Sequence, residues 1–230
     1  MFKRPLILVV HRASLVIAAA ALIVLWAGAW IAAETDRGPL HGVTLVVDAG
    51  HGGTERGVCY TSQGLIEKEI NLDVAKRLKT ALERAGAKVL LTRADDAELS
   101  LDARPEVANT APADLFLSIH TNRIPGHPEC FGAQTFYYPD SVAGKRLAEM
   151  LQAELLKVDP ANTRAALAGR YKVLRLAEMP SALVEIGFLT NARDRGLIAT
   201  DAYRDKITAA IVAGVIRYLR EAPAVEPQKT

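Results

Sequence analysis

The stretch TLVVDAGHGG, residues 44–53, decides the fold of this 230-residue chain. Residues 44–47 are β-branched or apolar, which favours a strand, and three glycines between positions 50 and 53 then end it in a tight loop. Two other runs are similar: LFLSIH at 115–120 and ALVE at 182–185. Short runs that are almost wholly apolar are typical of strands buried on both faces of a parallel sheet. Each run ends at, or just before, a histidine or a glutamate, so the predicted strands also position polar side chains.

Amphipathic segments separate these strands. Apolar residues recur every four positions from Ile70 to Leu82, which predicts a helix over 67–85 that ends at Gly86. We also expect helices over 101–111, 141–156 and 202–219, and further strands over 88–92, 132–138 and 171–174. Strands that alternate with helices indicate an α/β fold. We expect a single three-layer domain, with a mostly parallel twisted sheet and helices on both faces.

The N-terminal segment from Ala13 to Ala33 has a single polar side chain, Ser14. A helix of this length spans roughly 31 Å, close to the ~30 Å hydrocarbon core of a bilayer. Cations precede the segment and acids follow it, which places the N-terminus in the cytoplasm and the rest of the chain outside. We expect one transmembrane helix that acts as an uncleaved signal anchor. A cleaved signal peptide is the alternative, and a buried core helix is disfavoured because the segment is not amphipathic.

The expected organisation is a signal anchor over 1–33, a linker over 34–41, a catalytic domain over 42–220 and a flexible tail over 221–230. The catalytic domain is then extracytoplasmic, in the cell envelope, and either membrane-anchored or exported after cleavage. A net charge of +2 with no basic stripe argues against nucleic acid as a partner. Cys59 and Cys130 form no Cys-x-x-Cys pair, which argues against a thiolate zinc site, and the sequence leaves open a disulfide or two unpaired thiols.

Two histidines, His51 and His120, stand apart from the others. Glycines surround His51 and leave its ring free to point into a crevice, while His120 ends a buried strand. In open α/β sheets, the carboxyl ends of neighbouring strands converge on one crevice. Two imidazoles and a carboxylate gathered there can hold a metal ion and activate water. Glu67 and Glu69 both open the first long helix, where negative charge is favourable, so composition does not choose between them.

Glu185 lies in the apolar run SALVEIGFL, residues 181–189. Burying an ionised carboxylate there is costly unless it is paired or close to a cation. A nearby metal-activated water gives it a function, because the carboxylate can accept a proton and burial can tune its pKa. A buried salt bridge to an arginine is the structural alternative.

Four motifs in this order resemble the zinc-dependent N-acetylmuramoyl-L-alanine amidases of the AmiC-like (Amidase_3) type. They are DAGHGG at 48–53, EKEINL at 67–72, SIHTN at 118–122 and LVEIGFLTN at 183–191, and the resemblance covers about residues 43–220. It implies Zn²⁺ as the cofactor, with His51, Glu67 and His120 as its ligands and Glu185 as the catalytic residue. The implied reaction is hydrolysis of the amide bond between N-acetylmuramic acid and L-alanine in peptidoglycan.

A narrower likeness follows from Ile124-Pro125 and from GAQTFYYP at 132–139. These segments are similar to the spore-cortex, germination-specific branch, whose members act during sporulation and help to make muramic-δ-lactam. Asn122 and Arg123, just beyond His120, are candidate substrate contacts by position. Two rivals are a zinc peptidase that cuts within the stem peptide and a non-catalytic, membrane-tethered wall-binding or regulatory protein. The sequence also leaves open a need for an extracytoplasmic partner protein.

Overall fold

The computed structural model describes residues 22–24, 26, 38–60 and 63–221. The chain divides into two units, Met1–Pro39 and Leu40–Thr230, and the sheet lies in the second. Almost all of the predicted signal anchor lies outside the described residues, as do positions 34–37 of the linker and 222–230 of the tail. In the part of the chain that the structure describes, no helix has the length and apolar character that a membrane crossing requires.

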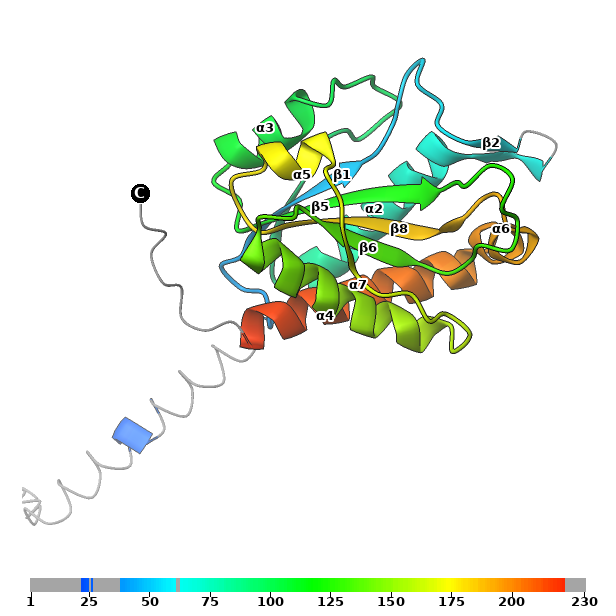
Figure 1. The fold of residues 1–230 in the computed structure, drawn as a ribbon. Coiled ribbons are helices and arrows are strands. Elements are labelled where there is room, and N and C mark those ends of the chain that lie inside the picture. Colours follow the sequence, from blue (N-terminus) through cyan, green and yellow to red (C-terminus); the bar gives the residue numbers. More distant parts are fainter. Residues whose placement is uncertain (1–21, 25, 27–37, 61–62, 222–230) are drawn as a thin grey trace, which may run out of the picture. The chain divides into compact units, whose positions relative to one another are not determined.

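Six strands of the second unit form one sheet in the order β4-β1-β5-β8-β6-β7 (Figure 1). Their bounds are β1 Thr44–Ala49, β4 Lys88–Leu91, β5 Leu115–Asn122, β6 Gln134–Tyr137, β7 Leu167–Ala168 and β8 Ser181–Phe188. Strands β4, β1, β5 and β8 are parallel, whereas β6 pairs antiparallel with β8 and parallel with β7. The prediction of a mostly parallel sheet is confirmed, with one antiparallel pairing that the sequence did not reveal.

Helices cover both faces of this sheet (Figure 1). Alternate residues of a strand face opposite sides, so Leu45 and Val47 belong to one apolar cluster and Val46 to another. The helices that pack into the first cluster include α2 (Glu67–Arg84), α4 (Val142–Val158) and α7 (Asp201–Glu221). Those that pack into the second are α3 (Ala103–Thr110) and α5 (Lys172–Leu176). The three layers expected from the alternation of strands and helices are therefore present.

Helix α2 illustrates how the sequence determines an element. Its buried face includes Val74, Leu78 and Leu82, spaced four residues apart, and each buried apolar side chain contributes about 1.5–3 kcal/mol. The helix begins with acidic residues in its first turn, where unpaired N–H groups favour negative charge. Beyond its end lies Gly86, whose φ of 100° lies in the positive range that suits glycine. A short hairpin of β2 (Cys59–Tyr60) and β3 (Leu65–Ile66) leads into it.

The prediction for residues 171–174 was wrong. They were expected as a strand but lead into helix α5, where Val173 and Leu174 are adjacent and buried in the same apolar cluster. Adjacent residues of a strand face opposite sides, so this burial suits a helix. Helix α6 (Ala192–Ile198), which packs against β8, was not predicted, because seven residues are too few to show a helical period. Of the two alternatives for the cysteines, the structure has unpaired thiols at Cys59 and Cys130.

Candidate metal centre

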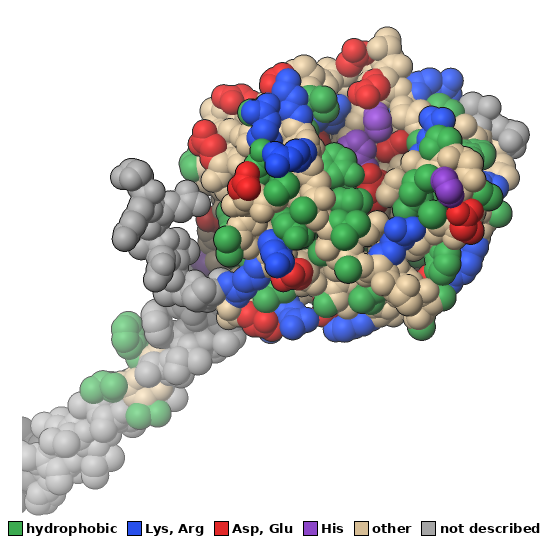
Figure 2. Space-filling view, viewed as in Figure 1, with side chains coloured by type: hydrophobic (Ala, Val, Ile, Leu, Met, Phe, Trp, Pro, Cys, Tyr) green, Lys and Arg blue, Asp and Glu red, His purple; other side chains and the backbone are tan. Residues whose placement is uncertain are grey.

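Three side chains from separate segments meet at the carboxyl edge of the parallel strands. His51 follows β1, His120 lies in β5 and Glu67 is the first residue of α2. Oε1 of Glu67 lies 3.1 Å from Nε2 of His51 and 3.2 Å from Nδ1 of His120. One donor atom from each residue lies within 4.8 Å of the other two. Figure 2 shows histidine and carboxylate side chains together in a hollow of the surface.

The chemistry of this donor set fits a zinc ion. A tetrahedral ion with bonds of about 2.0–2.1 Å holds its donors roughly 3.3 Å apart, which is close to both Glu67–imidazole distances. Two imidazoles and one carboxylate are a ligand set of catalytic zinc centres, which keep a fourth position open. Glu69, the other candidate at the start of α2, is exposed and lies outside the cluster.

Hydrogen bonds hold both carboxylate oxygens of Glu67. The amide of Val58 donates to Oε2 at 2.9 Å, and the amide of Thr121 donates to Oε1 at 3.1 Å. Burial alone would raise the pKa of Glu67, but the imidazoles of His120 and His51 hold that pKa well below its usual value. The carboxylate is therefore ionised at neutral pH, as a metal ligand must be.

Glycines make room for the cluster. A Cβ added to Gly50 would lie 2.2 Å from the ring of His120, and one added to Gly57 would lie 2.6 Å from Oε2 of Glu67. His51 itself has a φ of 61°, in the left-handed region that non-glycine residues rarely adopt. The glycine-rich loop after β1 therefore leaves room for the donor side chains to lie close together.

Glu185 lies directly opposite His120 in the register of β5 and β8. Its side chain is buried, and Oε2 has no hydrogen-bond partner among the described residues. Burial raises the pKa of Glu185 to about 7. Among the residues that the structure describes, Glu185 makes no ion pair, and the buried Arg104 pairs with Asp48 instead. The structure thus places an unpartnered carboxyl group beside the donor cluster rather than in the salt bridge that was its alternative.

Asn122 and Arg123 follow the cluster along the chain without joining it. Asn122 ends β5 and is half-buried, and its Oδ1 accepts a hydrogen bond from the amide of Arg123 at 2.7 Å. Arg123 is exposed. Their contact with a substrate stays a prediction.

Four buried polar residues around the centre were missed by the sequence analysis: Asp48, Asn71, Arg93 and Arg104. The signal for one pair was present, because Asp48 interrupts an apolar strand and a buried carboxylate needs a cation. Arg104 supplies that cation, with Nη1 at 2.9 Å from Oδ1 of Asp48. The sequence does not reveal this pair, because the two residues are 56 positions apart.

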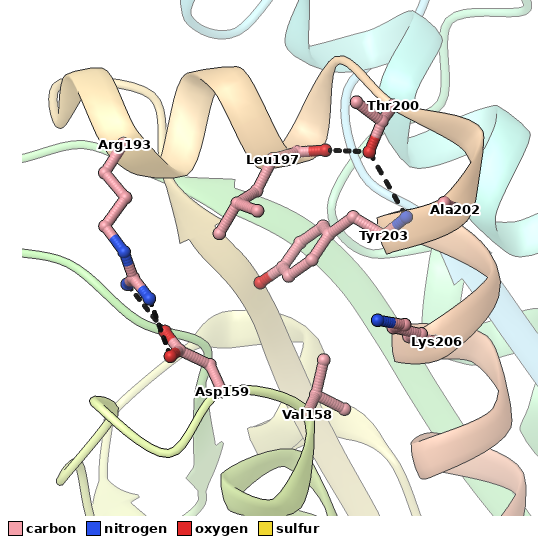
Figure 3. Close-up of a pocket in the computed structure, with 8 residues that line it drawn as sticks. All are labelled: Val158, Asp159, Arg193, Leu197, Thr200, Ala202, Tyr203 and Lys206. Atoms are coloured by element: carbon pink, nitrogen blue, oxygen red, sulfur yellow. Dashed lines mark hydrogen bonds and ion pairs between the residues drawn. The ribbon is translucent and has the colours of Figure 1, made fainter.

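A separate pocket of about 180 Å³ lies beside α6 and the start of α7 (Figure 3). Arg193 and Asp159 form an ion pair on one side of it, and Tyr203 and Lys206 line the other. None of the candidate ligands lines this pocket. It is therefore distinct from the donor cluster.

The α/β domain carries a His/Glu/His cluster, which could hold a metal ion, beside a buried carboxyl group, and these are the groups that a hydrolase uses to activate water. The family model for N-acetylmuramoyl-L-alanine amidase, Amidase_3, matches residues 45–217. The chain belongs to this family, whose members are hydrolases that act on peptidoglycan.

Relatives of known name agree with this membership. LytC, an N-acetylmuramoyl-L-alanine amidase of Bacillus subtilis, is 39% identical over 186 residues, which cover 80% of this chain but only 37% of LytC. The germination-specific N-acetylmuramoyl-L-alanine amidase of the same organism is 34% identical over 199 residues, covering 80% of this chain and 82% of the relative. The CwlD amidase from Clostridioides difficile, solved in complex with the GerS lipoprotein, matches with a TM-score of 0.74 and 34% identity. That match covers 78% of this chain and 99% of the CwlD chain.

Proposed function

We propose that this protein hydrolyses the amide bond between N-acetylmuramic acid and L-alanine in peptidoglycan, with Zn²⁺ held by His51, Glu67 and His120. The observation that carries the proposal is the meeting of these three donors at one point, with Glu185 opposite His120. Membership of the amidase family supplies the substrate class.

In the proposed mechanism, the three ligands hold zinc and Glu185 transfers protons. When bound, zinc supplies Lewis acidity that lowers the pKa of water and stabilises negative charge on the carbonyl oxygen. Glu185 accepts a proton from the attacking water at Oε2 while the water oxygen bonds to the lactyl carbonyl carbon. The same carboxyl group then donates that proton to the alanine nitrogen as the C–N bond breaks. The products are a muramic carboxyl group and a free stem peptide.

The environment of Glu185 suits both proton transfers. A general acid-base works best when its pKa lies near the operating pH, and burial brings that of Glu185 to about 7. In the described part of the chain, Oε2 has no hydrogen-bond partner that would compete for the proton. Glu67, by contrast, stays ionised and is held by backbone amides, so it binds rather than transfers protons.

Mass spectrometry of digested peptidoglycan tests this function. The purified protein, supplied with zinc, should release intact stem peptides and leave glycan with free muramic carboxyl groups, and a chelator should stop the release. Shortened peptides still attached to glycan would identify a zinc peptidase instead. Zinc binding without cleavage of peptidoglycan would identify a wall-binding or regulatory protein.

The finer proposal is action on spore-cortex peptidoglycan, in the formation of muramic-δ-lactam. It is supported by the segments at 124–125 and 132–139 and by the likeness to the germination-specific amidase and to CwlD. Spores of a strain that lacks the gene should have cortex without the lactam, and normal lactam content would refute this role. Asn122 and Arg123 are proposed as contacts to glycan or peptide.

Cellular placement and partners belong to the same proposal. We place the catalytic domain outside the cytoplasm, in the cell envelope, tethered by the apolar segment from Ala13 to Ala33. An extracytoplasmic partner is proposed because the CwlD relative was solved with a lipoprotein. Extraction of a membrane fraction with alkaline carbonate tests the tether, since an anchored protein stays with the membrane.

A further inference from the structure

Two buried guanidinium groups donate hydrogen bonds to three consecutive backbone carbonyls, those of Ala49, Gly50 and His51. Arg93 donates from Nε to the carbonyl of Ala49 at 2.8 Å and from Nη2 to that of Gly50 at 3.0 Å. Arg104 donates from Nη1 to the carbonyl of Ala49 at 2.8 Å and from Nη2 to that of His51 at 2.9 Å. The backbone carbonyls of Ala49, Gly50 and His51 are therefore all held by guanidinium groups.

The same two arginines reach the segments that carry the other donors. Nη2 of Arg93 also donates to the carbonyl of Lys68 at 2.8 Å, one residue beyond Glu67. Nη1 of Arg104 donates to Oδ1 of Asp48, whose Oδ2 accepts the Ser118 hydroxyl at 2.7 Å. Ser118 lies in β5, two residues before His120. Each guanidinium group thus links the His51 turn to the segment of another candidate ligand.

The charge balance of this arrangement is unfavourable for stability. Arg93 is 4% exposed and Arg104 is 2% exposed, and the buried carboxylate of Asp48, in β1, pairs with Arg104. In the described parts of the chain Arg93 makes no ion pair, and its donors are met by backbone carbonyls. Burial and the neighbouring Arg104 lower the pKa of Arg93. Apolar residues of similar volume often stabilise a core more than buried charges do. Stability therefore does not explain why two guanidinium groups are buried here.

Backbone strain at His51 supplies that explanation. A left-handed φ is unfavourable for a non-glycine residue, so the turn needs contacts that hold it. Gly52 is pressed against Arg93: a Cβ there would lie 3.1 Å from Cδ and Nε of Arg93. The arginines therefore support a backbone conformation that the imidazole of His51 requires in order to face Glu67.

We propose that Arg93 and Arg104 are positioning residues that set His51 in its metal-binding geometry before the metal arrives. This inference rests on the proposed zinc-dependent function, which it deepens. Only a guanidinium group has the fork of fixed donors that can meet several carbonyls at once, so lysine at either position keeps the charge and loses the support. Removal of such supporting hydrogen bonds typically costs 10–100-fold in metal affinity.

Zinc affinity of the folded protein, measured by competition with a chromophoric chelator, tests the proposal. We expect R93K and R104K to bind zinc at least tenfold more weakly than the unchanged protein. The absorption spectrum of bound Co²⁺, which reports ligand geometry, should change as well. R77K is the matched control, because Arg77 lies on α2 and, among the described residues, bonds the carboxylates of Asp73, Asp201 and Asp205 rather than the His51 turn. Its zinc affinity should stay within twofold of that of the unchanged protein.

The outcomes separate this inference from the proposed function. If the unchanged protein binds no zinc, the zinc-dependent function fails and the positioning role fails with it. If the unchanged protein binds zinc and folded R93K and R104K bind it equally well, the positioning role alone is wrong, even where their melting temperatures fall. Should a lysine variant not fold, R93Q and R104Q, whose side chains are neutral, are measured in the same assay and judged by the same criterion.

Discussion

Glu185 has a buried carboxyl oxygen that bonds none of the described residues, and the other residues of its strand are apolar or small. Its replacement by glutamine, E185Q, keeps the shape and removes the proton acceptor. We expect amidase turnover to fall by about 10²–10⁴-fold, the usual contribution of general acid-base catalysis, while zinc content is unchanged. Turnover and metal content are measured on the same preparation. E149Q, an exposed change on α4, is the control. Full activity of E185Q would remove Glu185 from the mechanism.

Zinc affinity should depend on pH through His120. Burial alone would lower the pKa of His120, but its hydrogen bond to Glu67 and the charges of Glu185 and Glu67 raise it above the usual value. Below that pKa the imidazole carries a proton that zinc must displace, so affinity should fall as the pH is lowered from 8 towards 6. Titration calorimetry in two buffers of different ionisation enthalpy counts the protons released. A flat affinity across this range would contradict the expectation.

The sequence predicted some individual residues of the centre and missed others, for physical reasons. His51 and His120 could be placed together because strand ends converge at one edge of a parallel sheet. Glu67 and Glu69 could not be separated by composition, since both suit a helix N-terminus, and only the fold buries Glu67 and exposes Glu69. The pairing of Asp48 with Arg104 depends on tertiary contacts that no local pattern encodes.

Among the elements, the β2–β3 hairpin and the turn before it press against the candidate centre. Gly57 and Gly64 both have a φ of 65°, but a Cβ on Gly57 would strike Glu67 and His51, whereas a Cβ on Gly64 would meet nothing within 4 Å. Both alanine variants should lose stability by roughly 1–2 kcal/mol from backbone strain alone. Only G57A should also lose zinc affinity. Chelator competition on both variants checks this, and equal affinities would show that Gly57 does not shape the centre.

The elements that were predicted correctly are those with strong periodicity or continuous apolar character. Runs such as 115–119 are buried on both faces and give an unambiguous strand, and α2 spans enough turns to show its period. Strand β7 has two residues and α5 has five, so neither contains a full pattern. The direction of β6 depends on how the chain returns to β8, which its own residues do not specify.

For the whole molecule, metal should couple to stability because the three donors come from segments distant in sequence. Free zinc at 100 times its dissociation constant stabilises the folded state by about 2.7 kcal/mol. For a domain of this size that is a rise in melting temperature of roughly 5–10 °C, which a chelator should reverse. Calorimetry with and without chelator measures the shift. H51A is the control, and its melting temperature should respond far less to the chelator.

The proposed zinc donors and the proposed proton carrier come from separate parts of the chain. The candidate ligands and both supporting arginines lie between residues 51 and 120, whereas the acid is delivered by β8, which inserts between β5 and β6. β8 is also the strand that joins β6 and β7 to the rest of the sheet. A chain interrupted before residue 181 therefore contains every proposed zinc donor yet neither a proton carrier nor a complete scaffold. Under the proposed mechanism, a chain that stops before β8 would therefore have no amidase activity.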